Sequence, residues 1–192
     1  MDDFILYCQL GWTHIMSPEA LDHLLFLSAL TALYVISDWK KVLFLITAFT
    51  IGHTATLFLS ILDIVRFKDS IVEWLIPLTI LMTAVANLIQ PNVHALPQKL
   101  KYLLALLFGL IHGMGFANSI RMMMASSQNL FIPLFSFNIG IELAQMTVVL
   151  CILILGTLLI EKMGMPQKKW IYALSGLAAG MALIMFIQRF VF

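Results

Sequence analysis

Residues 17–36 read SPEALDHLLFLSALTALYVI, an almost continuous apolar run that carries Asp22 and His23 side by side near its start. Serine followed by proline is a typical helix start, because proline lacks the N–H group that the first helical turn would leave unpaired. We therefore predict a helix with Ser17 as its N-cap and both ionisable residues in its first two turns. The free-energy cost of placing these two ionisable side chains on the helix depends on whether water or lipid surrounds it.

The composition of the chain indicates that this solvent is lipid. Of the 192 residues, 61% are hydrophobic and 11% are charged, and the mean hydropathy is +0.99. About a quarter of the residues of a soluble domain are charged, so the chain is expected to be a polytopic membrane protein in contact with the lipid bilayer. The net charge is +1 and the basic residues form no patch, which argues against nucleic acid as a partner.

Charged or proline-containing breaks divide the chain into apolar runs of the length that a transmembrane helix needs, about 20 residues. They predict an all-α, polytopic membrane helical bundle with about six transmembrane helices. The expected spans are residues 20–36, 41–62, 71–89, 101–122, 132–160 and 170–189. The loops are short, so we expect a single transmembrane domain over residues 1–192. Its N-terminal segment is expected to lie at the membrane interface, with Trp12 as an aromatic anchor.

Basic residues are distributed unequally between the two ends of the predicted bundle. With six spans, the end that holds the N-terminus has four, namely Arg66, Lys68, Arg121 and Arg189. The opposite end has seven, namely Lys40, Lys41, Lys99, Lys101, Lys162, Lys168 and Lys169. Because cytoplasmic loops carry the excess of Lys and Arg, both termini are expected outside.

Ionisable side chains recur at similar depths in four of the predicted helices. His53 and His112 lie in helices that run toward the outside, and Glu142 lies in the outer half of a helix that runs inward. Together with Asp22 and His23 they predict one shared polar site, because ionisable residues are costly in a bilayer and mark ion pathways or binding sites. Taken singly, each histidine would equally serve as a hydrogen-bonded contact between helices.

Three histidines with one or two carboxylates suit a first-row transition metal, because calcium and magnesium prefer oxygen ligands. The expected metal is nickel, zinc, cobalt or iron. We expect His23, His53, His112 and Glu142 to be ligands, with Asp22 orienting an imidazole from behind. Further residues are expected to line the pocket, namely Asn138, Gln145, Thr50 and Thr54.

Two other patterns bear on this site. Gly109 and Gly113 have the small-xxx-small spacing that lets a neighbouring helix approach the turn bearing His112. A polar stripe on the third predicted helix runs toward the inner side and is a candidate exit route if ions cross. Its residues are Thr79, Thr83 and Asn87.

Five ordered motifs carry a family resemblance: GWTHIMSPEALDHLLFLSAL, TAFTIGHTATLFL, VEWLIPLTIL, FGLIHGMGFA and FNIGIELAQ. Over about residues 11–150 the chain resembles the HupE/UreJ family of membrane proteins. The resemblance implies a bacterial inner-membrane protein that takes up nickel or a related metal for hydrogenase or urease maturation. The residues that match the family's histidine–aspartate–histidine feature and its later motifs are His14, Asp22, His23, His53, His112 and Glu142.

The interval between His14 and Asp22 departs from this pattern. Seven residues separate the two, which is longer than the interval typical of nickel permeases, and the SPEA helix start lies between them. His14 is therefore expected outside the helix that carries His23. Substitution of His14 is expected to weaken metal binding less than substitution of His23, His53 or His112.

Two functions from different classes fit these residues. The preferred one is a secondary permease, and not an enzyme, for Ni²⁺ or another divalent metal. The alternative is an intramembrane metalloenzyme in which His23, His53 and His112 bind zinc or iron and Glu142 or Asp22 acts as general base on a lipid or small substrate. A metal-stabilised structural partner of another membrane protein is least favoured. The expected partners are the lipid bilayer and the metal ion, and a homo-oligomer is compatible with the sequence.

Overall fold

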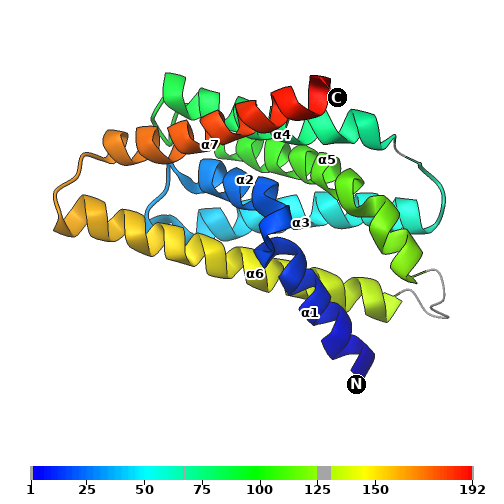
Figure 1. Cartoon of the computed structure of the whole chain (residues 1–192). Coiled ribbons are helices and arrows are strands. Elements are labelled where there is room, and N and C mark those ends of the chain that lie inside the picture. Colours follow the sequence, from blue (N-terminus) through cyan, green and yellow to red (C-terminus); the bar gives the residue numbers. More distant parts are fainter. Residues whose placement is uncertain (1, 67, 125–130, 192) are drawn as a thin grey trace.

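The computed structural model describes residues 2–66, 68–124 and 131–191, and within these ranges its long elements are seven α-helices (Figure 1). The helices are α1 (Asp2–Met16), α2 (Leu21–Thr31), α3 (Trp39–Ile61), α4 (Asp69–Ile89), α5 (Gln98–Met124), α6 (Phe131–Thr157) and α7 (Gln167–Val191). Short 3-10 turns at Pro18–Ala20 and Ile36–Asp38 flank α2, and a π-helical turn at Leu158–Lys162 extends α6.

Five of these helices, α3 to α7, are long and apolar enough to cross a membrane. They lie side by side with alternating directions (Figure 1), which confirms the expected all-α membrane bundle. The chain is a multi-pass membrane protein. The break expected at residues 126–130 lies outside the described residues.

The first expected span, residues 20–36, holds a helix that is shorter than the five candidate membrane spans found among the described residues. Its helix α2 has 11 residues and is therefore only about 16 Å long at 1.5 Å per residue, against a hydrocarbon core of about 30 Å. Beyond Thr31 the chain leaves the helix, and distant side chains bind its backbone there. Thr157 accepts a hydrogen bond from the Ile36 N–H at 3.0 Å, and Gln167 donates one to the Leu33 carbonyl at 3.3 Å.

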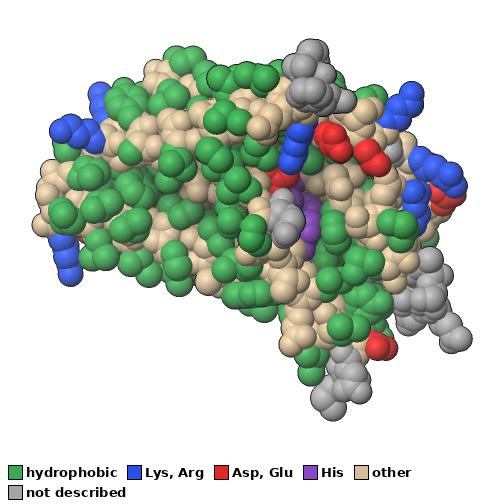
Figure 2. Space-filling model, viewed as in Figure 1, with side chains coloured by type: hydrophobic (Ala, Val, Ile, Leu, Met, Phe, Trp, Pro, Cys, Tyr) green, Lys and Arg blue, Asp and Glu red, His purple; other side chains and the backbone are tan. Residues whose placement is uncertain are grey.

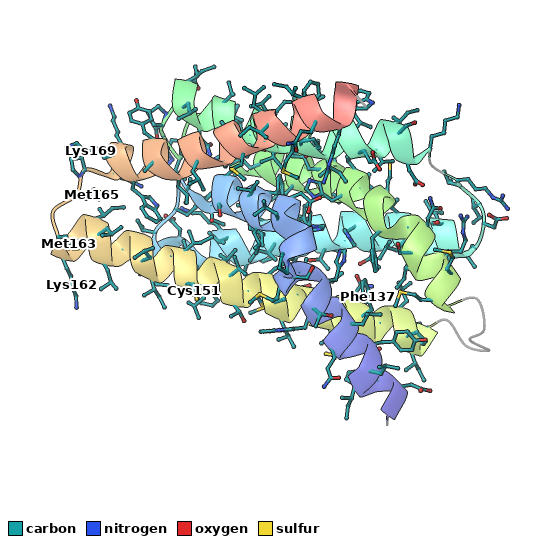
Figure 3. All side chains as sticks on the ribbon, viewed as in Figure 1. Phe137, Cys151, Lys162, Met163, Met165 and Lys169 are labelled. Atoms are coloured by element: carbon teal, nitrogen blue, oxygen red, sulfur yellow. The ribbon has the colours of Figure 1, made fainter. Side chains whose placement is uncertain are left out.

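The N-terminal segment expected at the membrane interface is helix α1, and it packs directly on α6 (Figure 1). Glycines make this close crossing sterically feasible. A Cβ atom on Gly11 would lie 1.9 Å from the Phe137 carbonyl oxygen, and one on Gly140 would lie 2.0 Å from that of Cys8. Figure 3 labels Phe137 on α6 next to this crossing. The segment is thus part of the bundle.

Glycines also bring α3 and α5 together. A Cβ atom on Gly109 would lie 2.1 Å from the Phe49 carbonyl oxygen, and one on Gly113 would lie 2.5 Å from that of His53. The predicted role of Gly109 and Gly113 in close helix packing is therefore confirmed, with α3 as the neighbouring helix.

The bundle has two ends that differ in charge. The lysine end, where α3, α5 and α7 begin, holds the seven lysines counted above, and Figure 3 shows Lys162 and Lys169 at its α6–α7 turn. The arginine end, where these helices finish, holds Arg66, Lys68, Arg121 and Arg189. On that end, Asp63 pairs with Arg66 at 2.7 Å and with Arg121 at 3.2 Å.

Candidate metal site

Three histidines from three different helices meet where α1 turns into α2. His14 is in the last turn of α1, His23 is in the first turn of α2, and His53 is near the middle of α3. One ring nitrogen or other ligand atom from each lies within 4.8 Å of the others. The centroids of the rings are 5.0 Å apart for His14 and His23, and 5.7 Å apart for the other two pairs. We call these three residues the histidine cluster.

The fourth histidine, His112 on α5, adjoins this cluster. Its ring centroid lies 5.1 Å from that of His23. Its Nε2 atom is hydrogen-bonded to the Thr79 hydroxyl at 3.0 Å, so only Nδ1 is left to act as a ligand. Thr79 therefore fixes the His112 ring, and the sequence offered this residue only as part of a polar stripe.

Several ring nitrogens of these histidines are buried without a hydrogen-bond partner among the residues that the structure describes. They are Nε2 of His14, Nε2 of His23, Nδ1 and Nε2 of His53, and Nδ1 of His112. Buried polar atoms without a partner are costly and rare. A neutral imidazole offers one nitrogen lone pair, so these side chains have the donor atoms that a transition metal needs.

Asp22 sets the orientation of His23. The Oδ1 atom of Asp22 accepts a hydrogen bond from the His23 backbone N–H at 2.8 Å and lies 2.9 Å from His23 Nδ1. A carboxylate on one imidazole nitrogen fixes the tautomer in which the other nitrogen carries the lone pair. His23 Nε2 is thereby left as the ligand atom. The Asp22 carboxylate thus orients the His23 ring, as the sequence predicted.

The spacing of the cluster is close to what a metal requires. Metal–nitrogen bonds of about 2.1 Å place two ligand nitrogens about 3 to 4 Å apart, and the three ligand atoms already lie within 4.8 Å of one another. The three ligand atoms would have to approach one another by about 1 Å to reach this range.

A cavity of about 710 Å³ reaches these histidines from the arginine end. His14, His23, His112 and Asp22 line its inner part, and Asp69, Glu73, Asn118, Ser119 and Arg189 are among the residues of its mouth. Figure 2 shows a histidine surface within this hollow, with acidic and basic side chains beside it. Asp69 and Glu73 are exposed, so a cation approaching from this end meets carboxylates first.

An aromatic pair bounds the site toward the lysine end. Phe26 and Phe49 are fully buried, their ring centroids lie 4.8 Å apart, and both rings contact His112 at 5.0 and 5.2 Å. On its other side Phe26 lies 6.0 Å from Phe108, which lines a second cavity of about 390 Å³. Thr83 and Asn87 of the predicted stripe also line that second cavity.

The structure places Glu142 away from the histidine cluster. Glu142, Gln145 and Asn138 form a row on α6 and face threonines on α3. The hydrogen bonds join Thr47 to Glu142 at 2.6 Å, Thr50 to Gln145 at 2.9 Å, and Thr54 to Asn138. Among the described residues, the linings of the two cavities do not include these six. The row is a polar contact between two helices, and a role for its members as metal ligand or pocket lining stays a prediction.

His14 and Arg189 also lie at this site. Since α1 is helical to Met16 and turns sharply into α2, His14 lies inside the cluster despite the seven intervening residues. The residues between His14 and Asp22 form the end of α1, the turn and the start of α2. From the sequence, Arg189 bore only on membrane orientation, because arginines near the ends of apolar helices commonly extend to the membrane interface. The structure places Arg189 in the lining of the cavity.

Five apolar helices around a buried histidine cluster define the class: a polytopic membrane protein with a candidate site for a transition metal. The chain matches the family described as HupE / UreJ protein over residues 1–190, and it belongs to the HupE/UreJ family. This family is generally associated with nickel or cobalt transport. Comparison with curated proteins gave no match, and comparison with solved structures gave none either.

Proposed function

We propose that this protein is a permease that takes up Ni²⁺, or the similar ion Co²⁺, through the histidine cluster. The observation that carries the proposal is the convergence of His14, His23 and His53, whose buried ring nitrogens lack hydrogen-bond partners among the described residues, beside a cavity that opens at one end. Imidazole is a preferred ligand of these metals. The association of the family with nickel and cobalt supports the same ions.

The direction of transport follows from the charges of the two ends. The lysine end carries seven basic residues and the arginine end four, so the positive-inside rule places the lysine end in the cytoplasm. The cavity then faces the outside of a bacterial inner membrane, with Asp69 and Glu73 at its mouth. An ion that enters there reaches the cluster before it meets the aromatic pair.

Passage to the cytoplasm requires the aromatic pair to open. Phe26 and Phe49 separate His112 from the second cavity, and Thr79, Thr83 and Asn87 extend along α4 from the first cavity toward the second. Movement of Phe26 and Phe49 would join the two cavities along this stripe. We assign the stripe to the exit route on this basis.

The proposal is tested by nickel titration of the detergent-purified protein. His14→Ala, His23→Ala and His53→Ala should each lower nickel affinity by at least tenfold, because each removes one ligand of three. His94→Ala is the matched control, since His94 is exposed in the α4–α5 loop. It should bind nickel as the wild type does.

Transport is then measured as nickel uptake into proteoliposomes under an applied membrane potential. The wild type and His94→Ala should show saturable uptake, and the three cluster variants should not. A folded wild type that binds neither nickel nor cobalt would refute the proposal. So would cluster variants that all keep full affinity.

A second candidate function, an intramembrane metalloenzyme, is favoured by the size of the cavity. The cavity has a volume of about 710 Å³, whereas one water molecule occupies about 30 Å³ in the liquid. The cavity is therefore large enough for a small organic substrate as well as a metal ion. Asp22 is the carboxylate nearest the cluster that would act as the base. About one zinc or iron per chain, retained through purification, would favour this function because a permease must release its cargo.

A further inference from the structure

Arg189 lies beside Asp22, the carboxylate that contacts His23 of the histidine cluster. It is in the last turn of α7 and lines the same cavity as Asp22, His23 and His112. Its Nη1 atom is 4.0 Å from Asp22 Oδ2 and donates a hydrogen bond to the Glu73 carbonyl oxygen at 3.3 Å. Among the described residues that line the cavity, Arg189 is the only lysine or arginine.

The two oxygens of Asp22 serve different partners. Oδ1 binds the backbone and ring of His23, and Oδ2 faces the Arg189 guanidinium. The Asp22 carboxylate therefore neutralises the positive charge of Arg189 and also orients the His23 ring. The Asp22 side chain is 12% exposed and that of Arg189 is 30% exposed, so water screens their interaction only in part.

A divalent ion in the cluster would change this balance. The ion and the guanidinium would both lie next to Asp22, and their like charges repel at short range. The arginine side chain is long and flexible, and the mouth of the cavity offers Asp69 and Glu73 as alternative partners. The arginine is the group that can move, because Asp22 is held by His23.

We propose that Arg189 is an internal counter-cation that pairs with Asp22 while the site holds no metal and is displaced from Asp22 when the metal binds. The proposal rests on the proposed permease function and adds to it a residue that sets affinity and release. The negative charge of Asp22 stabilises both the metal and the guanidinium, and these two cations repel each other, so the presence of one weakens the binding of the other by the same factor. Arg189 thus lowers the affinity of the site and helps the cargo to leave.

The test compares nickel affinity in purified Arg189→Gln, Arg189→Lys and wild-type proteins. Arg189→Gln removes the competing charge and should raise nickel affinity about tenfold, within the roughly 5- to 150-fold range of such couplings. Arg189→Lys keeps the charge and should stay near the wild type. Arg66→Gln is the matched control, because Arg66 is exposed at the same end and pairs with Asp63 outside the cavity. It should leave affinity unchanged.

A merely structural role for Arg189, holding α7 against α4 through the Glu73 carbonyl, predicts the opposite sign. Affinity that is unchanged or lower in Arg189→Gln would therefore overturn the inference while the permease proposal stands. A folded wild type that binds no nickel or cobalt would overturn both.

A second variant keeps the test decisive if Arg189→Gln is unstable. Arg189→Met also removes the charge, keeps an unbranched apolar stem, and should raise nickel affinity about tenfold. Affinity that is unchanged or lower in a folded Arg189→Met protein would overturn the inference.

Discussion

The close contact between α3 and α5 predicts that a single methyl group disrupts metal binding. A Cβ atom on Gly109 would lie 2.1 Å from the Phe49 carbonyl oxygen. Restoring an ordinary contact of about 3.4 Å moves the two helices apart by about 1.3 Å at this point. Gly109 lies one turn from His112, and Phe49 lies one turn from His53, so the displacement reaches both histidines.

The expected cost of Gly109→Ala has two parts. Overpacking a well-packed contact costs about 1–3 kcal/mol of stability. Metal ligands must also hold their distances to within about 0.2 Å, so a shift of about 1.3 Å is expected to reduce nickel affinity by at least tenfold. Thermal unfolding in detergent measures the first effect, and nickel titration of the folded protein measures the second.

Gly180→Ala is the matched control for this prediction. A Cβ atom on Gly180 in α7 would meet nothing within 4 Å, so this variant should bind nickel as the wild type does and unfold at the same or a slightly higher temperature. A Gly109→Ala protein with wild-type affinity and wild-type unfolding temperature would refute the reasoning that α3 and α5 position the site by direct backbone contact.

Two further predictions concern the cluster. Asp22→Asn should weaken nickel binding about 10- to 100-fold, because His23 loses the carboxylate that fixes its tautomer; unchanged affinity on titration would contradict this. Gly140→Ala should also weaken binding, because its Cβ would lie 2.0 Å from the Cys8 carbonyl oxygen and push away α1, which carries His14. Wild-type binding by this variant would show that α1 does not position a ligand.

The sequence predicted the long helices well because their signal is local. A run of about 20 apolar residues in lipid must satisfy its own backbone hydrogen bonds, and a helix does so within the segment. The five helices α3 to α7 accordingly begin and end within a few residues of the expected spans. The same reasoning did not foresee that α2 stops at Thr31, after which Thr157 and Gln167 bind the backbone at Ile36 and Leu33. Those partners are more than 100 positions away in the chain.

The sequence by itself determined that this is a helical membrane protein, which histidines lie within its apolar helices, and that Asp22 adjoins His23. Only the tertiary structure decided which of these residues meet. It brings His14 into the cluster through the turn between α1 and α2, pairs Glu142 with Thr47, and sets Arg189 beside Asp22. The physical reason is that depth along a helix can be counted from the sequence, whereas the direction in which each side chain faces depends on how the helices rotate and how closely their glycines let them pack.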